Sequence, residues 1–502
     1  SGVGDVEGAG VGDTAGAAGQ PGGARTAGSP SAARRYEKDG CHTFKMQSVA
    51  ASLTLRRQLE TRACCFACKL CSSMAPRSLL ALLALAASAG ALNVVRNKNF
   101  GKLQGGYLFP EIGRRRTAFA EKNPELAEKI ISLGIGDTTK PIPEHILSGL
   151  VNGAKKLGTV EGYSGYGAEQ GKGDLREKIA ASCYGDRVKA SEVFVSDGAK
   201  CDISRLQLMF GSEVVSAVQD PSYPVYVDTS VMMGQTGEVN KETGQFDKLV
   251  YMPCAAADDF FPDLAKVPRA DVYYFCSPNN PTGAVATRAQ LEALVARALK
   301  DGSILVFDAA YAPFIRSEGT PTSIFEIEGS RQCAIEVNSF SKYAGFTGAR
   351  LGWTVVPDEL TYSDGSSVRD DFNRVMTTGF NGASNIVQEG GMACLDPEGK
   401  KEIDALIDYY LGNAEILRGL ADDLGLDHYG GVDSPYVFVD LKGHSSWDTF
   451  STILEEAQVV TIPGAGFGPG GEGYLRFSAF APREACLEAR ERISKIDIFK
   501  GQ

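Results

Sequence analysis

Residues 304–311 read ILVFDAAY, a run of four apolar residues that ends in an aspartate and is followed three residues later by a tyrosine. An apolar run without polar alternation is typical of a strand that is buried on both faces of a parallel sheet. Asp308 would then emerge at the carboxyl end of the strand, and Tyr311 would lie in the loop beyond it. The stretch therefore predicts a buried strand that brings a carboxylate to the edge of a sheet.

Other stretches repeat this pattern, each an apolar run that ends in small or polar residues: VFVSDGAK (193–200), VVSAVQDPSY (214–223) and VYYFCSPNNPTG (272–283). The segment RAQLEALVARALK (288–300) has helical spacing and lies between VYYFCSPNNPTG and ILVFDAAY. Alternating strands and helices predict βαβ units and an α/β fold with a mostly parallel sheet flanked by helices. Ligands bind at the carboxyl ends of the strands in such sheets.

The C-terminal part has a different pattern. A helical segment at 400–425 is followed by SPYVFVDL (434–441) and GYLRFSAF (473–480), which alternate as strands do. We expect a smaller α+β domain here. The predicted organisation is a leader at 1–90, an N-terminal arm and part of the small domain at 91–149, a large cofactor-binding domain at 150–405 and a C-terminal small domain at 406–502.

Residues 339–350, SFSKYAGFTGAR, place Lys342 behind two serines and eight positions ahead of Arg350. Lysine forms Schiff bases with carbonyl groups, and hydroxyls with a guanidinium at short spacing suit a phosphate dianion. The stretch therefore favours pyridoxal 5'-phosphate (PLP), a phosphorylated aldehyde, as the ligand. The alternative is a solvated loop, since Ser, Lys and Gly are common in loops.

Asp308, Tyr311 and Asn280 fit the same cofactor. A buried carboxylate opposite the pyridine nitrogen would keep that nitrogen protonated, while a tyrosine hydroxyl and an amide would donate to the phenolic oxygen. Alone, Asp308 is equally typical of a helix N-cap and Asn280 of an Asn-Pro turn. Their order ahead of the Ser-x-Ser-Lys stretch favours the cofactor site.

Composition excludes several classes of function. A net charge of −11 and the absence of a basic cluster in the body of the chain argue against nucleic-acid binding. Of twelve cysteines, five lie before residue 72, and the remaining seven have no paired spacing, so we expect reduced thiols. CCFACKLC (64–71) has no second ligand pair at zinc-site spacing, and we expect no metal.

The leader has two candidate starts. Residues 1–45 are rich in Gly and Ala and contain too few apolar side chains to fold. After Met46 the sequence is rich in Ser, Ala and Arg with Glu60 as its one acidic residue up to Cys65, and after Met74 a short apolar run follows a basic residue. Both patterns are typical of import sequences, and the apolar run is too short for a membrane span.

One glycine motif could instead indicate a dinucleotide-binding site. Gly466, Gly468 and Gly471 in GAGFGPGG spell G-x-G-x-x-G, but a strand pattern follows them where a helix is required. The histidines beyond the leader fall in no motif, which argues against a histidine-based hydrolase. A PLP-binding regulator would need a DNA-binding helix pair or a basic patch, and neither is evident.

Together, these motifs resemble the fold-type I aminotransferases of the aspartate aminotransferase superfamily from about residue 97 to the end. The resemblance implies that Lys342 is the catalytic lysine that holds PLP. It implies further cofactor contacts from Ala199, Lys200, Tyr223, Asn280, Asp308, Tyr311, Ser339, Ser341 and Arg350. It also implies that Arg476 binds the substrate α-carboxylate beside Gly134, a task for which a surface ion pair is the plain alternative.

Stretches outside the cofactor motifs resemble the LL-diaminopimelate aminotransferases of plants and algae: NKNFGKLQGGYLFPEIGRRR (97–116), LGIGDTTKPIP (133–143), GYGAEQGKGDLR (165–176), SDGAKCDISRLQ (196–207) and FNGASNIVQEGG (380–391). This resemblance implies a homodimer whose sites are shared between subunits. Tyr107, Glu169, Lys200, Asn280 and Asn381 would contact substrate. Tyr166, preferred to Tyr163 because it adjoins GAEQ, would reach the site of the neighbouring subunit together with Glu169 and Asn381, and Tyr166 would contact the cofactor there.

The activity that this resemblance implies is transfer of an amino group between L-glutamate and tetrahydrodipicolinate in lysine biosynthesis, in the plastid stroma. Glu169 and Lys200 would pair with the charges at the far end of diaminopimelate. The alternatives are an aromatic or alanine-type aminotransferase for the chain, a solvated carboxylate for Glu169 and a packing anchor for Tyr107. We expect no nucleic-acid partner and no membrane association of the mature form.

Overall fold

The predicted strands form a seven-stranded sheet in the computed structural model, which describes residues 94–103, 107–134 and 136–499. The strand order is β2-β8-β7-β6-β5-β3-β4, and the pairs among β7, β6, β5, β3 and β4 are parallel, whereas β8 is antiparallel to both neighbours. The strands are β2 (Val193–Ser196), β3 (Ser216–Asp220), β4 (Val250–Pro253), β5 (Val272–Cys276), β6 (Ile304–Asp308), β7 (Ala334–Ser339) and β8 (Gly352–Val355). The prediction of a mostly parallel sheet is confirmed.

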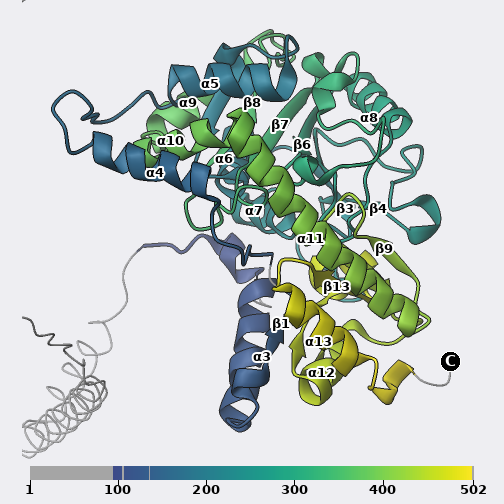
Figure 1. The fold of residues 1–502 in the computed structure, drawn as a ribbon. Helices are drawn as coiled ribbons and strands as arrows, with labels where there is room; N and C mark the ends of the chain where they lie inside the picture. The colour runs from purple at the N-terminus through teal and green to yellow at the C-terminus, as the bar shows by residue number, and fades with distance from the viewer. Residues whose placement is uncertain (1–93, 104–106, 135, 500–502) are drawn as a thin grey trace, which may run out of the picture. The chain divides into compact units, whose positions relative to one another are not determined.

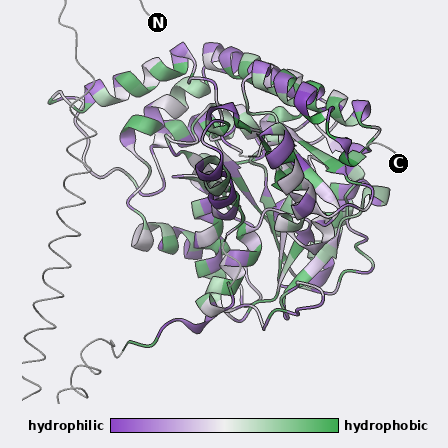
Figure 2. Ribbon diagram, turned by 90° about the horizontal axis from the view of Figure 1, so that it is seen from below, coloured by the Kyte–Doolittle hydropathy of each residue, from purple (hydrophilic) through white to green (hydrophobic). Residues whose placement is uncertain are grey.

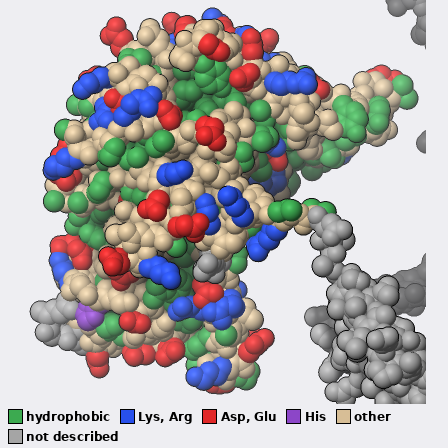
Figure 3. Space-filling view, turned by 180° about the vertical axis from the view of Figure 1, so that it is seen from behind, with side chains coloured by type: hydrophobic (Ala, Val, Ile, Leu, Met, Phe, Trp, Pro, Cys, Tyr) green, Lys and Arg blue, Asp and Glu red, His purple; other side chains and the backbone are tan. Residues whose placement is uncertain are grey.

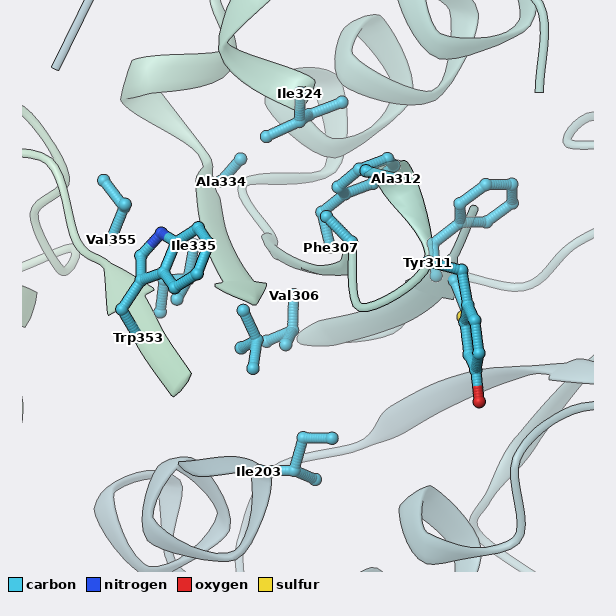
Figure 4. Packing of buried hydrophobic residues seen from close by; sticks show 14 of the residues in the cluster. Ile203, Val306, Phe307, Tyr311, Ala312, Ile324, Ala334, Ile335, Trp353 and Val355 are labelled. Atoms are coloured by element: carbon cyan, nitrogen blue, oxygen red, sulfur yellow. The ribbon is translucent and has the colours of Figure 1, made fainter. Parts of the chain in front are cut away.

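Helices surround this sheet, as Figure 1 shows. They are α4 (Glu144–Lys156), α5 (Gly173–Ile179), α6 (Ala199–Phe210), α7 (Val225–Met233), α8 (Arg288–Asp301), α9 (Val368–Gly379) and α10 (Asn385–Cys394). In Figure 4, Ile203 of α6 lies on one side of β6 and β7, and Ile324 lies on the other. Apolar side chains therefore cover both faces, which explains why the strands lack polar alternation.

Local sequence explains the bounds of α8. Thr287 caps its first turn by accepting from Gln290 N, and the Gln290 side chain accepts from Thr287 N in return. Gly302 ends the helix in the left-handed conformation at φ 63°. Figure 2 shows that the outer helices carry both hydrophilic and hydrophobic residues, as expected for helices with one buried face.

A smaller sheet with its own helices, called the second layer below, has a separate hydrophobic core. A four-stranded antiparallel sheet of order β12-β13-β10-β9 packs with α3 (Leu108–Lys122), α12 (Ser446–Ala457) and α13 (Arg483–Ile493). The strands are β9 (His428–Gly430), β10 (Tyr436–Asp440), β12 (Ile462–Pro463) and β13 (Tyr474–Ser478). The short parallel pair β1 (Ile131–Ser132) and β11 (Val459–Val460) joins the N-terminal segment to this layer.

One helix connects the two cores. In Figure 1, α11 (Pro397–Asp423) runs from the region of the large sheet toward α13. Its Ile403, Leu406, Ile407 and Tyr410 belong to the core of the large sheet, and its Ala414, Leu417 and Leu420 belong to the second core. The domain boundary predicted at 405/406 thus falls inside a continuous helix.

Part of the sequence interpretation lies outside the described residues, namely the leader at 1–90 and the cysteines at 64–71. The seven cysteines within the described ranges are free thiols. No helix in those ranges combines the length and apolar character needed to cross a lipid bilayer.

Candidate active site

A cavity of about 600 Å³ lies at the carboxyl ends of the large sheet. Twelve of the residues predicted from the sequence line it: Tyr107, Ala199, Lys200, Tyr223, Asn280, Asp308, Tyr311, Ser339, Ser341, Lys342, Arg350 and Arg476. Parallel register explains part of this convergence, because Cys276 of β5 pairs with Asp308 of β6 and the loops that follow both strands leave from the same edge. The volume suits a cofactor together with a small substrate.

Lys342 follows β7 and extends into the cavity, where its Nζ donates to the Gly136 carbonyl. Burial lowers the pKa of Lys342 to about 8, and the positive charges of Arg476 and Arg350 act in the same direction, whereas Asp137 opposes them. An amine with this pKa is partly neutral near neutral pH. It therefore has the free electron pair that a nucleophile or general base needs.

Asp308 is buried at the end of β6. Tyr226 donates its hydroxyl to Oδ2 at 2.7 Å and the Ala310 N–H donates to Oδ1 at 3.0 Å. Burial raises the pKa of Asp308, and these two donors oppose that rise. The carboxylate is thus a buried acceptor that a cationic ring N–H would complement.

The opposite side of the cavity collects donors for an anion. Arg350 donates from Nη1 to Ser341 Oγ at 3.2 Å and to the Thr347 carbonyl at 3.1 Å. The N–H groups of Ala199 and Lys200 open helix α6, and neither has an acceptor among the described residues. A helix N-terminus with free N–H groups beside a guanidinium suits a phosphate.

Gly198 makes this arrangement possible. Its φ is +124°, and a Cβ built there would lie 2.4 Å from Arg350 Nη2. Only a residue without a side chain lets the Arg350 guanidinium approach the start of α6 so closely. The small residue in SDGAK is therefore needed for the anion site.

Arg476 extends from β13 and is fully buried. Its Nη1 donates to Asn280 Oδ1 at 2.6 Å and its Nη2 donates to the Gly134 carbonyl. Its Nε has no partner, and no carboxylate forms an ion pair with it among the described residues. Because a buried cation needs a counter-charge, this site calls for an anionic ligand.

Aromatic rings enclose the Arg476 guanidinium. The ring centroids of Tyr436, Phe467 and Phe109 lie 4.2, 4.9 and 5.9 Å from its Cζ. These rings fix the plane of the guanidinium and exclude water from its faces. They also explain why the charge is tolerated away from solvent.

Lys200 provides a second cation in the lining of the cavity. Its Nζ lies 4.8 Å from the ring centroid of Tyr107 and 5.8 Å from that of Tyr223. Burial lowers the pKa of Lys200. Burial raises the pKa of the nearby Asp228 carboxyl to about 6, and Lys200 opposes that rise.

Four predicted residues do not line the cavity. The Gly134 carbonyl accepts a hydrogen bond from Arg476. A contact between Gly134 and substrate would therefore use the Gly134 N–H, and this contact stays a prediction. Tyr166 is 88% exposed, and Asn381 is exposed. A Cβ built on Gly382 would lie 3.0 Å from the Ala168 carbonyl oxygen and 3.6 Å from Glu169 Cα, so the chain around Glu169 and Asn381 lies together.

Several residues of the site were not predicted from the sequence: Phe109, Asp137, Tyr226, Tyr436 and Phe467. Tyr226 follows Tyr223 at helical spacing, which was a usable signal. Tyr436 lies within SPYVFVDL, yet nothing in a strand pattern indicates which hydroxyl partner a tyrosine will meet. Phe109 and Phe467 approach Arg476 only through the tertiary fold.

The glycine-rich loop 464–471 has a structural part in the site. Two 3₁₀ turns and then β13 follow one another there, so the loop opens no helix that would bind a pyrophosphate. Its Phe467 packs on Arg476, and the Phe467 carbonyl accepts from Ser222 N at 2.9 Å. The dinucleotide interpretation has no support in this geometry.

Comparisons with known proteins agree with the site. The family model for class I and II aminotransferases matches residues 128–493. The chain is 57% identical over 404 residues to "LL-diaminopimelate aminotransferase, chloroplastic" of Arabidopsis thaliana, and the match covers 80% of this chain and 87% of that protein. It is 56% identical over 404 residues to "Probable LL-diaminopimelate aminotransferase, chloroplastic" of Oryza sativa subsp. japonica, covering 80% and 86%.

Among solved structures, the chain is similar to the L,L-diaminopimelate aminotransferase from Chlamydomonas reinhardtii. The TM-score is 0.78 and the sequence identity is 60%, with 80% of this chain and 99% of that chain covered. An aspartate aminotransferase from Thermus thermophilus, a double mutant that is 21% identical, shares the fold with a TM-score of 0.67. The fold-type I prediction is confirmed, and the chain belongs to the class I and II aminotransferases.

Proposed function

We propose that this chain is a PLP-dependent LL-diaminopimelate aminotransferase. It interconverts LL-2,6-diaminopimelate and 2-oxoglutarate with tetrahydrodipicolinate and L-glutamate. The observation that carries the proposal is the convergence of Lys342, Arg350 and Arg476 on one cavity, with a buried carboxylate at Asp308. Identities of 56 to 60% to enzymes of that name support the choice of substrate.

The cavity fits the cofactor group by group. Asp308 would meet the pyridine nitrogen, while Tyr311 and the free amide nitrogen of Asn280 would meet the phenolic oxygen. Ser339, Ser341, Arg350 and the start of α6 would hold the phosphate, and Tyr223 would lie against the ring. When bound, PLP acts as an electron sink for the amino acid that is attached to it.

Lys342 then performs the proton transfers. With its amine free, Lys342 would remove a proton from the substrate Cα and later return one. Arg476 binds the α-carboxylate through its planar guanidinium and so orients the Cα–H bond toward Lys342. The rings around Arg476 keep water away from this contact.

The far end of diaminopimelate carries an ammonium and a carboxylate. Lys200, with Tyr107 beside it, offers a cation for that carboxylate. Glu169 and Asn381 from a second copy of the chain would meet the ammonium. A purely apolar amino donor would offer Lys200 no carboxylate to bind.

The test of the substrate is direct. Purified protein loaded with PLP should form glutamate from LL-diaminopimelate and 2-oxoglutarate. Phenylalanine and alanine as amino donors should give much less product. If either replaces diaminopimelate while diaminopimelate gives no glutamate, the substrate assignment is wrong although the chain remains an aminotransferase.

The homodimer with shared sites has support in exposed apolar residues of α4 and the loop that follows it. Val160, Tyr163 and Tyr166 are 90, 70 and 88% exposed, and Leu147 and Val151 are also exposed. Figure 3 shows hydrophobic side chains gathered on the projection at the right of the view. Exposed apolar side chains in one region are typical of a surface that another molecule covers.

Complementation tests the shared sites. Lys342→Ala and Glu169→Ala lie in different subunits of each proposed site, so a mixed dimer has one site with both lesions and one intact site. Subunit exchange between the two inactive variants should restore about a quarter of the wild-type activity. No recovery after demonstrated exchange would place Glu169 in its own subunit's site.

We also propose that the mature enzyme works in the plastid stroma. The chloroplast labels of the rice and Arabidopsis relatives and the Ser/Ala/Arg-rich sequence after Met46 support this location. A fusion of residues 46–96 to a fluorescent protein should enter plastids and be shortened there. Cytosolic fluorescence would contradict the proposal.

A further inference from the structure

Tyr436 of β10 lies at the junction of three parts of the site. Its side chain is buried with 1% exposure, and its hydroxyl lies 2.7 Å from that of Tyr311. Its ring centroid lies 4.2 Å from Arg476 Cζ. The same hydroxyl borders Gly136, the residue whose carbonyl accepts from Lys342.

We propose that Tyr436 is a positioning residue of the transamination site, acting through Tyr311 and Arg476. The inference rests on the proposed PLP-dependent function. Tyr311 has one hydroxyl proton, which it needs for the phenolic oxygen of the cofactor. Tyr436 must then be the donor in the bond between the two hydroxyls, and Tyr311 accepts from it.

This direction has a chemical consequence. A hydroxyl that accepts a hydrogen bond becomes a stronger donor, because the two bonds polarise each other. Tyr311 would therefore stabilise the negatively charged phenolic oxygen better with Tyr436 than without it. Removal of the Tyr436 hydroxyl should make the bound cofactor hold its proton to a higher pH.

Tyr436 also explains why residue 136 is glycine. A Cβ built on Gly136 would lie 2.4 Å from the Tyr436 hydroxyl oxygen but 3.6 Å from the ring carbon Cζ that carries it. The first distance is a clash with the hydroxyl, and the second is an ordinary van der Waals contact. The absence of a side chain at Gly136 therefore makes room specifically for the hydroxyl.

The first experiment is a pH titration of the visible absorption of the PLP-loaded enzyme. Tyr436→Phe keeps the ring over Arg476 and removes only the hydroxyl. The midpoint of its titration should lie about one pH unit above that of the wild type. A purely structural role in packing predicts an unchanged midpoint.

Tyr273→Phe is the matched control. Tyr273 is fully buried in β5 at the end of the strand remote from the cavity, and its hydroxyl donates to Asp301 at 2.7 Å. This substitution also removes one tyrosine hydroxyl together with its hydrogen bonds. The midpoint of the titration should stay at the wild-type value.

A double-mutant cycle gives an independent measurement. Gly136→Ala alone should lower kcat/KM about ten-fold because the added methyl group displaces the Tyr436 hydroxyl. In the Tyr436→Phe background the same change should cost less than about two-fold, since the methyl group then makes only van der Waals contacts, with the ring and with Lys342 Nζ at 3.7 Å. Equal costs in both backgrounds would overturn the proposal.

The outcomes separate the two proposals. If the wild type gains no visible band with PLP, the proposed function fails. If the wild type binds PLP and transaminates but Tyr436→Phe titrates as the wild type does, only the role of Tyr436 fails. Thermal unfolding of each variant checks that its fold is retained.

Discussion

The cavity has a floor and a roof of different origin. The floor consists of Asp308, Ser339, Ser341, Lys342 and Arg350 with the start of α6, which lie at the ends of strands of the large sheet and in the segments that follow them. The roof consists of Tyr107, Phe109, Tyr436, Phe467 and Arg476, from the N-terminal segment and the second layer. On the floor, Ser341 and Arg350 are bonded nine residues apart, whereas in the roof the bond from Arg476 to Gly134 spans 342 residues.

This difference separates two tasks. Floor residues are fixed relative to one another by short loops on a rigid sheet, which suits a resident cofactor. Roof residues depend on how the second layer packs, which suits the recognition of a substrate that enters and leaves. Substitutions in the floor should therefore weaken PLP binding or impair the chemistry, whereas substitutions in the roof should lower substrate affinity and leave the affinity for PLP nearly unchanged.

The largest effect is expected at the floor. Lys342→Ala removes the group that we propose holds the cofactor and moves the Cα proton, so kcat should fall at least about 10³-fold. Steady-state glutamate formation measures it, with Lys300→Ala, an exposed residue of α8, as the control. Activity within ten-fold of the wild type would remove Lys342 from catalysis.

A roof substitution gives the contrasting result. Arg476→Lys loses the planar pair of donors that reach Asn280 and Gly134 and that we propose bind the substrate carboxylate, so kcat/KM should fall about 100-fold. PLP affinity, measured by absorbance titration, should change by less than about two-fold. Arg483→Lys is the control, because Arg483 also lies on a tyrosine ring, Tyr409, at 4.8 Å but outside the cavity.

A smaller effect is expected when the hydrogen bonding of Asp308, a floor residue, is weakened. Tyr226→Phe removes the 2.7 Å hydrogen bond to Asp308, which leaves the buried carboxylate with the Ala310 N–H as its one remaining donor among the described residues. The pKa of Asp308 should rise further and PLP should bind about ten-fold more weakly. Loss of substrate affinity with unchanged PLP affinity would contradict the division into floor and roof.

The smallest expected effect is the pH dependence of the rate at which the apoprotein binds PLP. The pKa of Lys342 is lowered from the ordinary lysine value to about 8, so its amine loses the proton as pH rises through that value. The rate of PLP capture by the apoprotein should rise about five-fold from pH 7 to 8 and less than two-fold from pH 8 to 9. Stopped-flow absorbance measures this rate, and a flat profile would show an amine that is already neutral at pH 7.

Most floor residues were predictable from the sequence pattern, whereas the roof residues that were predicted came from family resemblance. Apolar runs such as ILVFD indicated the parallel strands, and their polar ends indicated Asp308, Asn280 and Lys342, because buried strands and the loops after them have local signatures. Resemblance added Arg476, Lys200 and Tyr107, which the structure places in the same cavity. The assignments of Tyr166, Glu169 and Asn381 to a neighbouring subunit remain predictions.

Tertiary structure decided the rest. The enclosure of Arg476 by Phe109, Tyr436 and Phe467 depends on the packing of the second layer against the large sheet, and no spacing in the sequence encodes it. The bond between the Tyr311 and Tyr436 hydroxyls joins residues 125 positions apart. The sequence alone determined the strands and the groups at their ends because those depend on local burial. Only the fold determined which buried polar groups form hydrogen bonds with one another. A buried polar group needs a partner, and the packing of segments that are distant in the sequence decides which group that partner is.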